Sequence, residues 1–107
     1  MQPFSPIHGA TIAIAASSAG SAAAAFPAGV LPGGAYQVRV HNAGASTAFV
    51  DFGAADVVAG SGDDLPIPAG AVEVLTVVST EQNRVTHAAA ITASGTATVY
   101  FTPGAGI

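Results

Sequence analysis

The chain has 107 residues, of which 50% are hydrophobic and 7% are charged, and it contains neither cysteine nor lysine. Six acidic and two basic residues give a formal net charge of −4. This charge excludes the cationic surface that phosphate binding requires, so we expect no contact with nucleic acid. Ordinary soluble domains have about 25% charged residues. A surface with so little charge stays dispersed in water only where much of it is covered. The composition therefore predicts a homo-oligomer or a subunit that packs into a larger assembly.

The N-terminal segment predicts an extended arm over residues 1–9, because Pro3 and Pro6 are incompatible with a helix there. The arm contains no Lys or Arg, unlike the basic start of a secretory signal. Residues 12–25 are mostly alanine and serine, too weakly apolar to span a membrane. We therefore expect an unprocessed, soluble chain with no membrane contact and a single domain over residues 10–107.

Two short segments follow the arm. Residues 11–15 predict a strand. Residues 21–26 contain four consecutive alanines, which favour a helix by propensity, but so short a helix is not stable alone. Because Pro27 follows directly and the rest of the chain alternates, we favour a strand over a helix for this segment.

Alternation with period two is clear in the middle of the chain. Residues 36–41 and 47–52 predict two strands, and the small and polar residues 42–46 predict the turn between them, so this region predicts a hairpin. In the second strand, Val50 and Phe49 point to opposite faces.

The last third predicts three more strands. Residues 66–70 break the chain before a strand at 71–78, and residues 85–92 and 96–102 predict a final hairpin around 93–95. The final strand separates two faces, with Ala97, Val99 and Phe101 on one and Thr96, Thr98, Tyr100 and Thr102 on the other. Threonine suits an exposed strand face, to which Tyr100 adds an aromatic ring. The residues after 102 predict a C-terminal tail. About seven to eight short strands in total predict an all-β fold, an antiparallel β-sandwich or jelly roll.

The sequence contains no recognisable catalytic motif. The three histidines, His8, His41 and His87, are not accompanied by a G-x-S-x-G nucleophile elbow. Asp51 and Glu73 are a candidate carboxylate pair for glycoside hydrolysis. The chain has no tryptophan and only two tyrosines, however, so it offers few aromatic platforms for a sugar. We expect no enzymatic activity.

One segment has a loose metal-site pattern. Residues 59–65 resemble a single imperfect copy of the calcium-binding nonapeptide of parallel β-rolls. Asp63 and Asp64 with loop carbonyls are a candidate for a weak calcium site. The other interpretation, which we favour, is a turn in which glycine supplies a positive φ and aspartate bonds its own backbone. We expect no cofactor.

Three segments carry a resemblance to a known family: residues 67–74, 86–91 and 95–104. Together with the chain length and strand pattern, over residues 36–107, they make the sequence similar to the small capsid decoration, or cement, proteins of tailed bacteriophages. The resemblance implies a β-sandwich or jelly roll on the outside of a virion. It also implies a dimer or trimer that clamps neighbouring copies of the major capsid protein. No residue motif of that family transfers position by position.

The expected contact residues are Phe4 and Ile7 in the arm, which could add a strand to a neighbour's sheet edge, and Thr96, Thr98 and Tyr100 on the last strand. The alternative function is a phage tail or fibre adhesion module that binds a host-surface glycan, and a further alternative is a structural subunit of the tail or neck. The fold does not distinguish these functions. The scarcity of aromatic residues counts against glycan binding.

Overall fold

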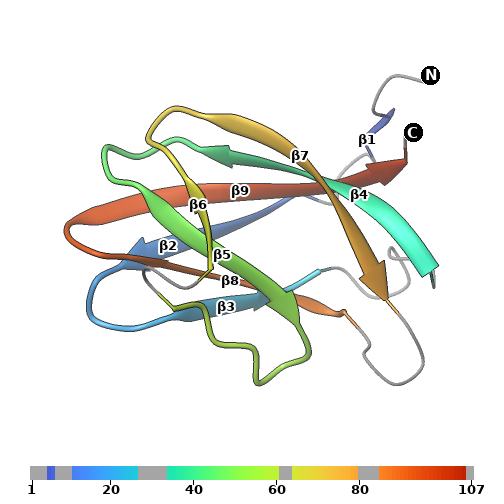
Figure 1. The fold of residues 1–107 in the computed structure, drawn as a ribbon, viewed down its shortest axis with the longest axis horizontal. Helices are drawn as coiled ribbons and strands as arrows, with labels where there is room; N and C mark the ends of the chain where they lie inside the picture. The colour runs from blue at the N-terminus through green and yellow to red at the C-terminus, as the bar shows by residue number, and fades with distance from the viewer. Residues whose placement is uncertain (1–4, 7–10, 27–33, 61–63, 80–84, 106–107) are drawn as a thin grey trace.

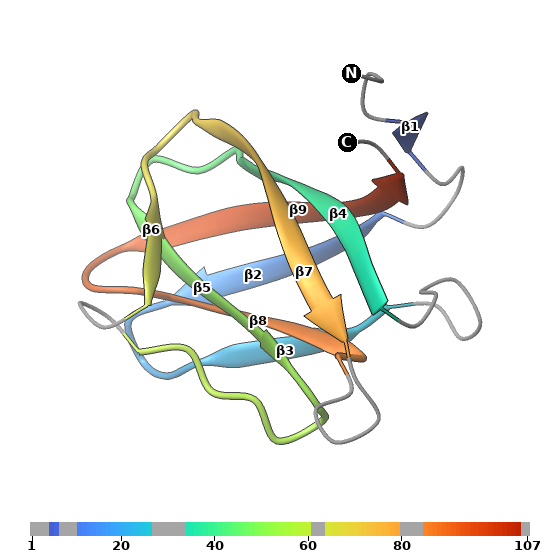
Figure 2. The same ribbon diagram turned by 45° about the vertical axis from the view of Figure 1, so that its right-hand side comes forward.

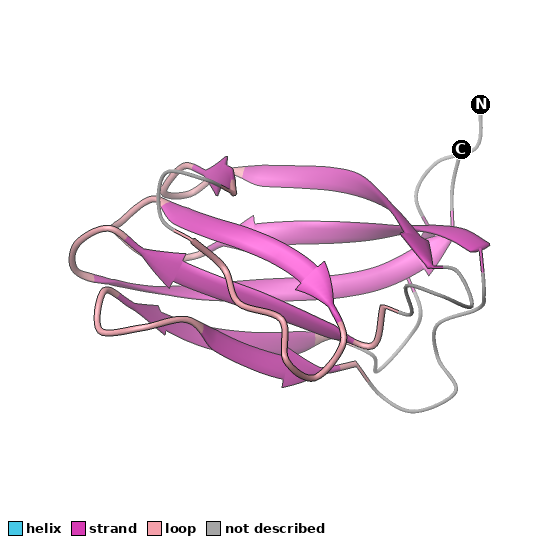
Figure 3. Cartoon of the chain, turned by 60° about the horizontal axis from the view of Figure 1, so that its bottom comes forward, coloured by secondary structure: helices cyan, strands magenta, loops and turns pink. Residues whose placement is uncertain are grey.

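Two antiparallel sheets packed face to face make up the fold (Figures 1 and 3). It is seen in a computed structural model that describes residues 5–6, 11–26, 34–60, 64–79 and 85–105. Sheet A contains β1, β2, β9, β4 and β7, and sheet B contains β3, β8, β5 and β6. The described residues contain no helix. The strands are β1 (Ser5–Pro6), β2 (Ile12–Ser17), β3 (Ala22–Ala25), β4 (Gly34–Asn42), β5 (Ala48–Gly53), β6 (Leu65–Ile67), β7 (Val72–Ser79), β8 (His87–Thr92) and β9 (Thr96–Ala105).

The strand pairing follows one simple rule. β2 pairs with β9, β3 with β8, β4 with β7 and β5 with β6, all antiparallel. The chain is therefore one long hairpin whose tip is the β5–β6 connection, rolled so that successive pairs fall in alternate sheets (Figure 2). The β4–β9 and β5–β8 pairings join these pairs within each sheet. This is the jelly-roll arrangement of eight strands, and it confirms the predicted all-β sandwich or jelly roll.

The core lies between the two sheets and is built from side chains of unequal size. Sheet A contributes Val38, Val40, Val99 and Phe101, all fully buried, whereas the β8 strand of sheet B contributes alanines at the facing positions. The Phe101 ring packs edge-on against Phe52 of β5, with a centroid distance of 5.8 Å. The small side chains of β8 leave room between the sheets for the larger side chains of the core.

The alanine run settles the ambiguity at residues 21–26. Residues Ala22–Ala25 form β3. Ala22 and Ala24 pack against the core, while Ala23 and Ala25 point outward and are exposed. The expectation of a strand is confirmed. Pairing with β8 provides hydrogen-bond partners for the β3 backbone. This pairing outweighs the intrinsic preference of alanine for a helix.

Both predicted hairpins are wrong in their pairing. β4 and β5 lie in different sheets, and so do β8 and β9, so residues 42–46 and 93–95 are arches that carry the chain from one sheet to the other. Alternation specifies which face of a strand is buried but not which strand lies beside it. In a rolled hairpin, consecutive strands bury their apolar faces against each other across the core, which produces the same sequence pattern as a flat hairpin.

The ends of two strands also differ from expectation. Residues 65–67 form the short strand β6 although Pro66 lies within it, because β6 is an edge strand and needs no donor on its open side. β9 continues to Ala105, so the tail predicted after residue 102 is wrong for residues 103–105.

Within the predicted arm, β1 pairs in the same chain with Ala105 and Gly104. No helix of the described residues is long and apolar enough to cross a membrane.

Candidate functional site

The outward side of sheet A is a broad, nearly uncharged surface. Cross-strand register aligns its side chains in rows, one of which runs Ala13, Tyr100, His41, Val72. We call this surface the threonine face. Its members are Thr11, Ala13, Ala15 and Ser17 of the β2 region; Thr96, Thr98, Tyr100 and Thr102 of β9; Gln37, Arg39 and His41 of β4; and Val72, Val74 and Thr76 of β7.

Contacts between neighbouring strands order the middle of the threonine face. The His41 and Tyr100 rings stack with centroids 6.2 Å apart and planes 28° from parallel, and Tyr100 remains 39% exposed. The hydroxyls of Thr11 and Thr102 are hydrogen-bonded at 2.8 Å. Arg39 is the only residue of the face with a permanent charge. The face therefore offers hydroxyls, aliphatic groups and one aromatic pair in fixed positions, which suits contact with another protein surface.

The outward side of sheet B, in contrast, is partly covered by its own chain. Ala89 points away from the core on β8 yet is fully buried. Ala59, in the β5–β6 connection, is 2% exposed, and its N–H donates to the Ser21 Oγ beside β3 at 2.9 Å. Neither alanine belongs to the core cluster between the sheets. The connection thus lies against this side of sheet B, whereas no described segment covers the threonine face, which is the open side of the sandwich in this part of the chain.

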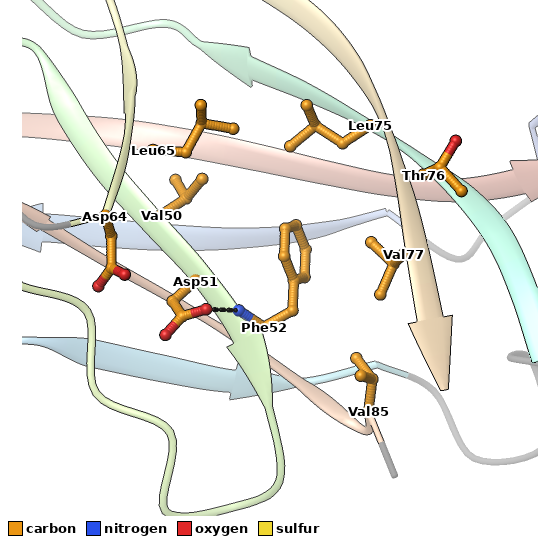
Figure 4. A pocket seen from close by; sticks show the side chains of 9 residues that line it. All are labelled: Val50, Asp51, Phe52, Asp64, Leu65, Leu75, Thr76, Val77 and Val85. Carbon is orange, nitrogen blue, oxygen red and sulfur yellow. Dashed lines mark hydrogen bonds between the residues drawn. The ribbon is translucent and has the colours of Figure 1, made fainter. Parts of the chain in front are cut away.

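A groove opens between the two sheets at the edge formed by β5, β6 and β7 (Figure 4). It has a volume of about 410 Å³. Its lining is mainly apolar, and Figure 4 shows the side chains of Phe52, Leu75 and Val77 gathered within it, while the Asp51 and Asp64 carboxylates lie to one side. The sequence pattern gave no sign of this groove, because it arises where β6 ends and leaves part of β5 without a neighbour.

The described candidate catalytic residues do not form one constellation, and His8 lies outside the described residues. Asp51 lies on β5 in sheet B and lines the groove, whereas Glu73 lies on β7 in sheet A and does not. One Asp51 oxygen accepts a hydrogen bond from the Phe52 N–H at 2.8 Å, as Figure 4 shows. His87 is on sheet B, bonded to the Thr86 hydroxyl at 2.7 Å, on the opposite side of the sandwich from the histidine of the threonine face.

The candidate calcium loop has one described carboxylate. Asp64 accepts a hydrogen bond from the Gly60 N–H at 2.7 Å, and its own N–H donates to the Gly60 carbonyl at 3.1 Å. These bonds close the turn from within, as the turn interpretation expects. Asp63 lies outside the described residues. In the part of the chain that is described, no three potential metal-ligating side chains come together.

The expected contact residues fall into two groups. Thr96, Thr98 and Tyr100 all lie on the threonine face. Phe4 and Ile7 lie outside the described residues. Sequence reasoning overlooked the exposed valines of the same face, Val72 at 43% and Val74 at 46%, as contact residues. Their common parity with Thr76 was visible in the sequence, but their position on an outward face required the pairing of β7 with β4.

Comparisons with known proteins give no match, whether the sequence is compared with protein-family models and curated proteins or the structure with solved structures. The fold itself defines the chain as a jelly-roll β-sandwich. Jelly rolls occur in viral capsid proteins and in lectins, among others.

Proposed function

We propose that this protein is a virion structural subunit, a decoration protein that attaches to the outside of a phage head through the threonine face and stabilises contacts between capsid subunits. The proposal rests on one observation above all. The broad side of sheet A is open, ordered and almost free of charge, while the corresponding side of sheet B is partly covered by the β5–β6 connection.

Energetics support a role for this face in binding. Val72, Val74 and Tyr100 are exposed large apolar side chains on one surface of a small domain. Truncation of a buried interface tyrosine commonly costs 2 kcal/mol or more, which corresponds to about 30-fold in affinity. Threonine hydroxyls can pair with backbone groups of a partner without the desolvation cost of a buried charge. A capsid surface made of polypeptide is a suitable partner.

The test is a binding titration on shells assembled from the major capsid protein encoded with this chain. We expect saturable binding, a loss of about 30-fold for Tyr100→Ala, and a larger loss for Thr98→Arg, which places a long cation on the face two residues before Tyr100. Thr47→Arg is the matched control, because Thr47 is exposed on the connection before β5 and lies off the face. Equal affinities for all four proteins would refute the proposal, as would a particle density map that places the subunit away from the head.

Glycan adhesion is the second candidate, and the His41–Tyr100 stack favours it. A partly exposed aromatic pair beside Arg39 could hold one face of a sugar ring. This candidate predicts binding to immobilised host glycans that Tyr100→Ala abolishes, with no binding to capsid shells. The capsid and glycan arms of the experiment therefore separate the two functions with the same set of variants.

A further inference from the structure

The edges of the two sheets are not equally protected against pairing with another strand. The edge strands β3 and β6 of sheet B are four and three residues long, and β6 contains a proline. In sheet A, one edge is formed by β2 with β1 continuing beside β9, and the other is β7, which is eight residues long. Short strands and proline are common ways of blocking an edge. β7 has neither.

β7 is the longest of the described edge strands and is a suitable acceptor for an additional strand. Among the described residues, no strand pairs with its outer side. It contains no proline, glycine or lysine, and Glu73 is its only charged residue. A long, regular, weakly charged edge of this kind carries unpaired backbone N–H and C=O groups that a second strand can satisfy.

The groove beside β7 shows what such a strand would cover. Leu75 and Val77 point into the groove from β7, and Phe52 and Leu65 line it from sheet B (Figure 4). A strand added to the outer side of β7 would place its inward side chains over these residues. Its side chains must be apolar to fill the groove without burying a charge.

We propose that β7 pairs with β7 of a second copy, antiparallel and about a twofold axis at Thr76, to form a dimer with one continuous sheet. A twofold interface requires a patch that complements itself. With Thr76 opposite Thr76, Leu75 of each copy lies opposite Val77 of the other on the inward side. Each copy thus supplies the apolar side chains that the groove of the other lacks.

Glu73 disfavours the registers centred on itself, Val74 and Leu75. Directly opposite residues point to the same side of the sheet. Centring the pair on Glu73 would place two glutamates side by side, and centring it on Val74 or Leu75 would place Glu73 opposite Leu75 or Val77 at the groove. Centring on Thr76 moves Glu73 to the end of the paired segment. The pairing does not depend on what the threonine face binds, and it would place two such faces on one sheet.

The experiment uses the absence of cysteine from the chain. Single-cysteine variants Thr76→Cys, Val74→Cys, Val72→Cys and Thr98→Cys are oxidised under the same mild conditions, and the rate of disulfide dimer formation is measured. The Cα atoms of directly opposed residues on antiparallel strands lie about 4.5–5.5 Å apart, within the Cα–Cα range of a disulfide. We expect Thr76→Cys to cross-link at least tenfold faster than the other three. Thr98 is the control, because β9 is paired on both sides.

Light scattering of cysteine-free protein provides the second measurement. The unsubstituted chain should be a dimer, Leu75→Lys should be a monomer because it places a cation in the groove, and Val58→Lys, at a 70% exposed position on a connection, should remain a dimer. Circular dichroism checks that each variant is folded. Fastest cross-linking at Thr98 would indicate face-to-face association and overturn the proposal. Fastest cross-linking at Val74, or a monomeric unsubstituted chain, would overturn it equally.

Discussion

Asn42 is the most deeply buried polar residue of the described segments, and its side chain makes three hydrogen bonds. It ends β4 and is fully buried. Its side-chain NH2 donates to the Ser46 carbonyl at 2.8 Å and to the Ile67 carbonyl at 2.9 Å, and its side-chain oxygen accepts from the Gly44 N–H at 2.9 Å. One amide group therefore fixes the arch between the sheets and ties it to β6, at the edge of sheet B.

Asn42→Ala should destabilise the protein by about 3–5 kcal/mol. The substitution leaves two carbonyls and one N–H without their partners, and an unsatisfied buried group costs roughly 1–3 kcal/mol. For 107 residues, an unfolding entropy of about 2.1 cal/mol/K per residue converts this loss to a decrease in Tm of about 13–22 °C. Because small domains are stable by only about 5–15 kcal/mol, the variant would be close to unfolding at 37 °C.

Urea and thermal unfolding, followed by circular dichroism, measure the effect. Gln37→Ala in the same strand is the control and should change stability by no more than about 0.5 kcal/mol, because its side chain is on the half-exposed outward side. Asn42→Asp should be no more stable than Asn42→Ala at neutral pH. A carboxylate still accepts from the Gly44 N–H, but it cannot donate to the two carbonyls, and its second oxygen would lie against the carbonyl oxygens and repel them. If Asn42→Ala cost less than 1 kcal/mol, the buried amide would not be a tether and the reasoning would be wrong.

Three further substitutions test the packing, each measured by urea unfolding. Gly44→Ala should lose about 1–3 kcal/mol, because the new Cβ would lie 2.7 Å from the Ala97 Cβ, whereas Gly20→Ala, with nothing within 4 Å, should be neutral or stabilising. Phe101→Ala should lose about 3–5 kcal/mol, since the ring is fully buried in the core; a smaller loss would mean that the sheets collapse onto the cavity. Thr92→Val should lose about 1–3 kcal/mol, because this 1% exposed residue donates to a turn carbonyl at 2.7 Å and a valine leaves that carbonyl unpaired.

The faces of the strands could be predicted from the sequence, and their partners could not. The inward sets Ala48, Val50, Phe52 and Ala97, Val99, Phe101 follow directly from alternation, and both are confirmed. Pairing depends instead on the geometry of the connections. The first arch packs against β9, with the Ala43 N–H bonded to the Thr98 carbonyl and Gly44 close to Ala97. It also lies beside the second arch, where Ser46 is close to Gly95. Such contacts between distant segments leave no local signal, so the arch residues were interpreted as ordinary turns.

The candidate site was predictable to the same extent. The parity of Thr96, Thr98 and Tyr100 identified them as an outward-facing set, and the structure places them on the open side of sheet A. Nothing local indicated that Val72 and Val74 extend this surface, because only the β4–β7 register brings them alongside His41 and Arg39. The position of Asn42 in a predicted turn likewise concealed that its side chain is buried.

The distribution of charge connects the composition to the geometry. The four acidic residues of the described segments lie on the β5–β6 connection, at the groove or on the inward side of β7, and none lies on the threonine face. The low overall charge is therefore not spread evenly over the molecule. Among the described residues, the threonine face contains one permanently charged side chain, Arg39, and β7 contains one, Glu73. A partner can therefore approach either place and desolvate only a single permanent charge per copy. The attachment proposed for the threonine face and the pairing proposed for β7 both require this low charge, because a buried unpaired charge would weaken each contact.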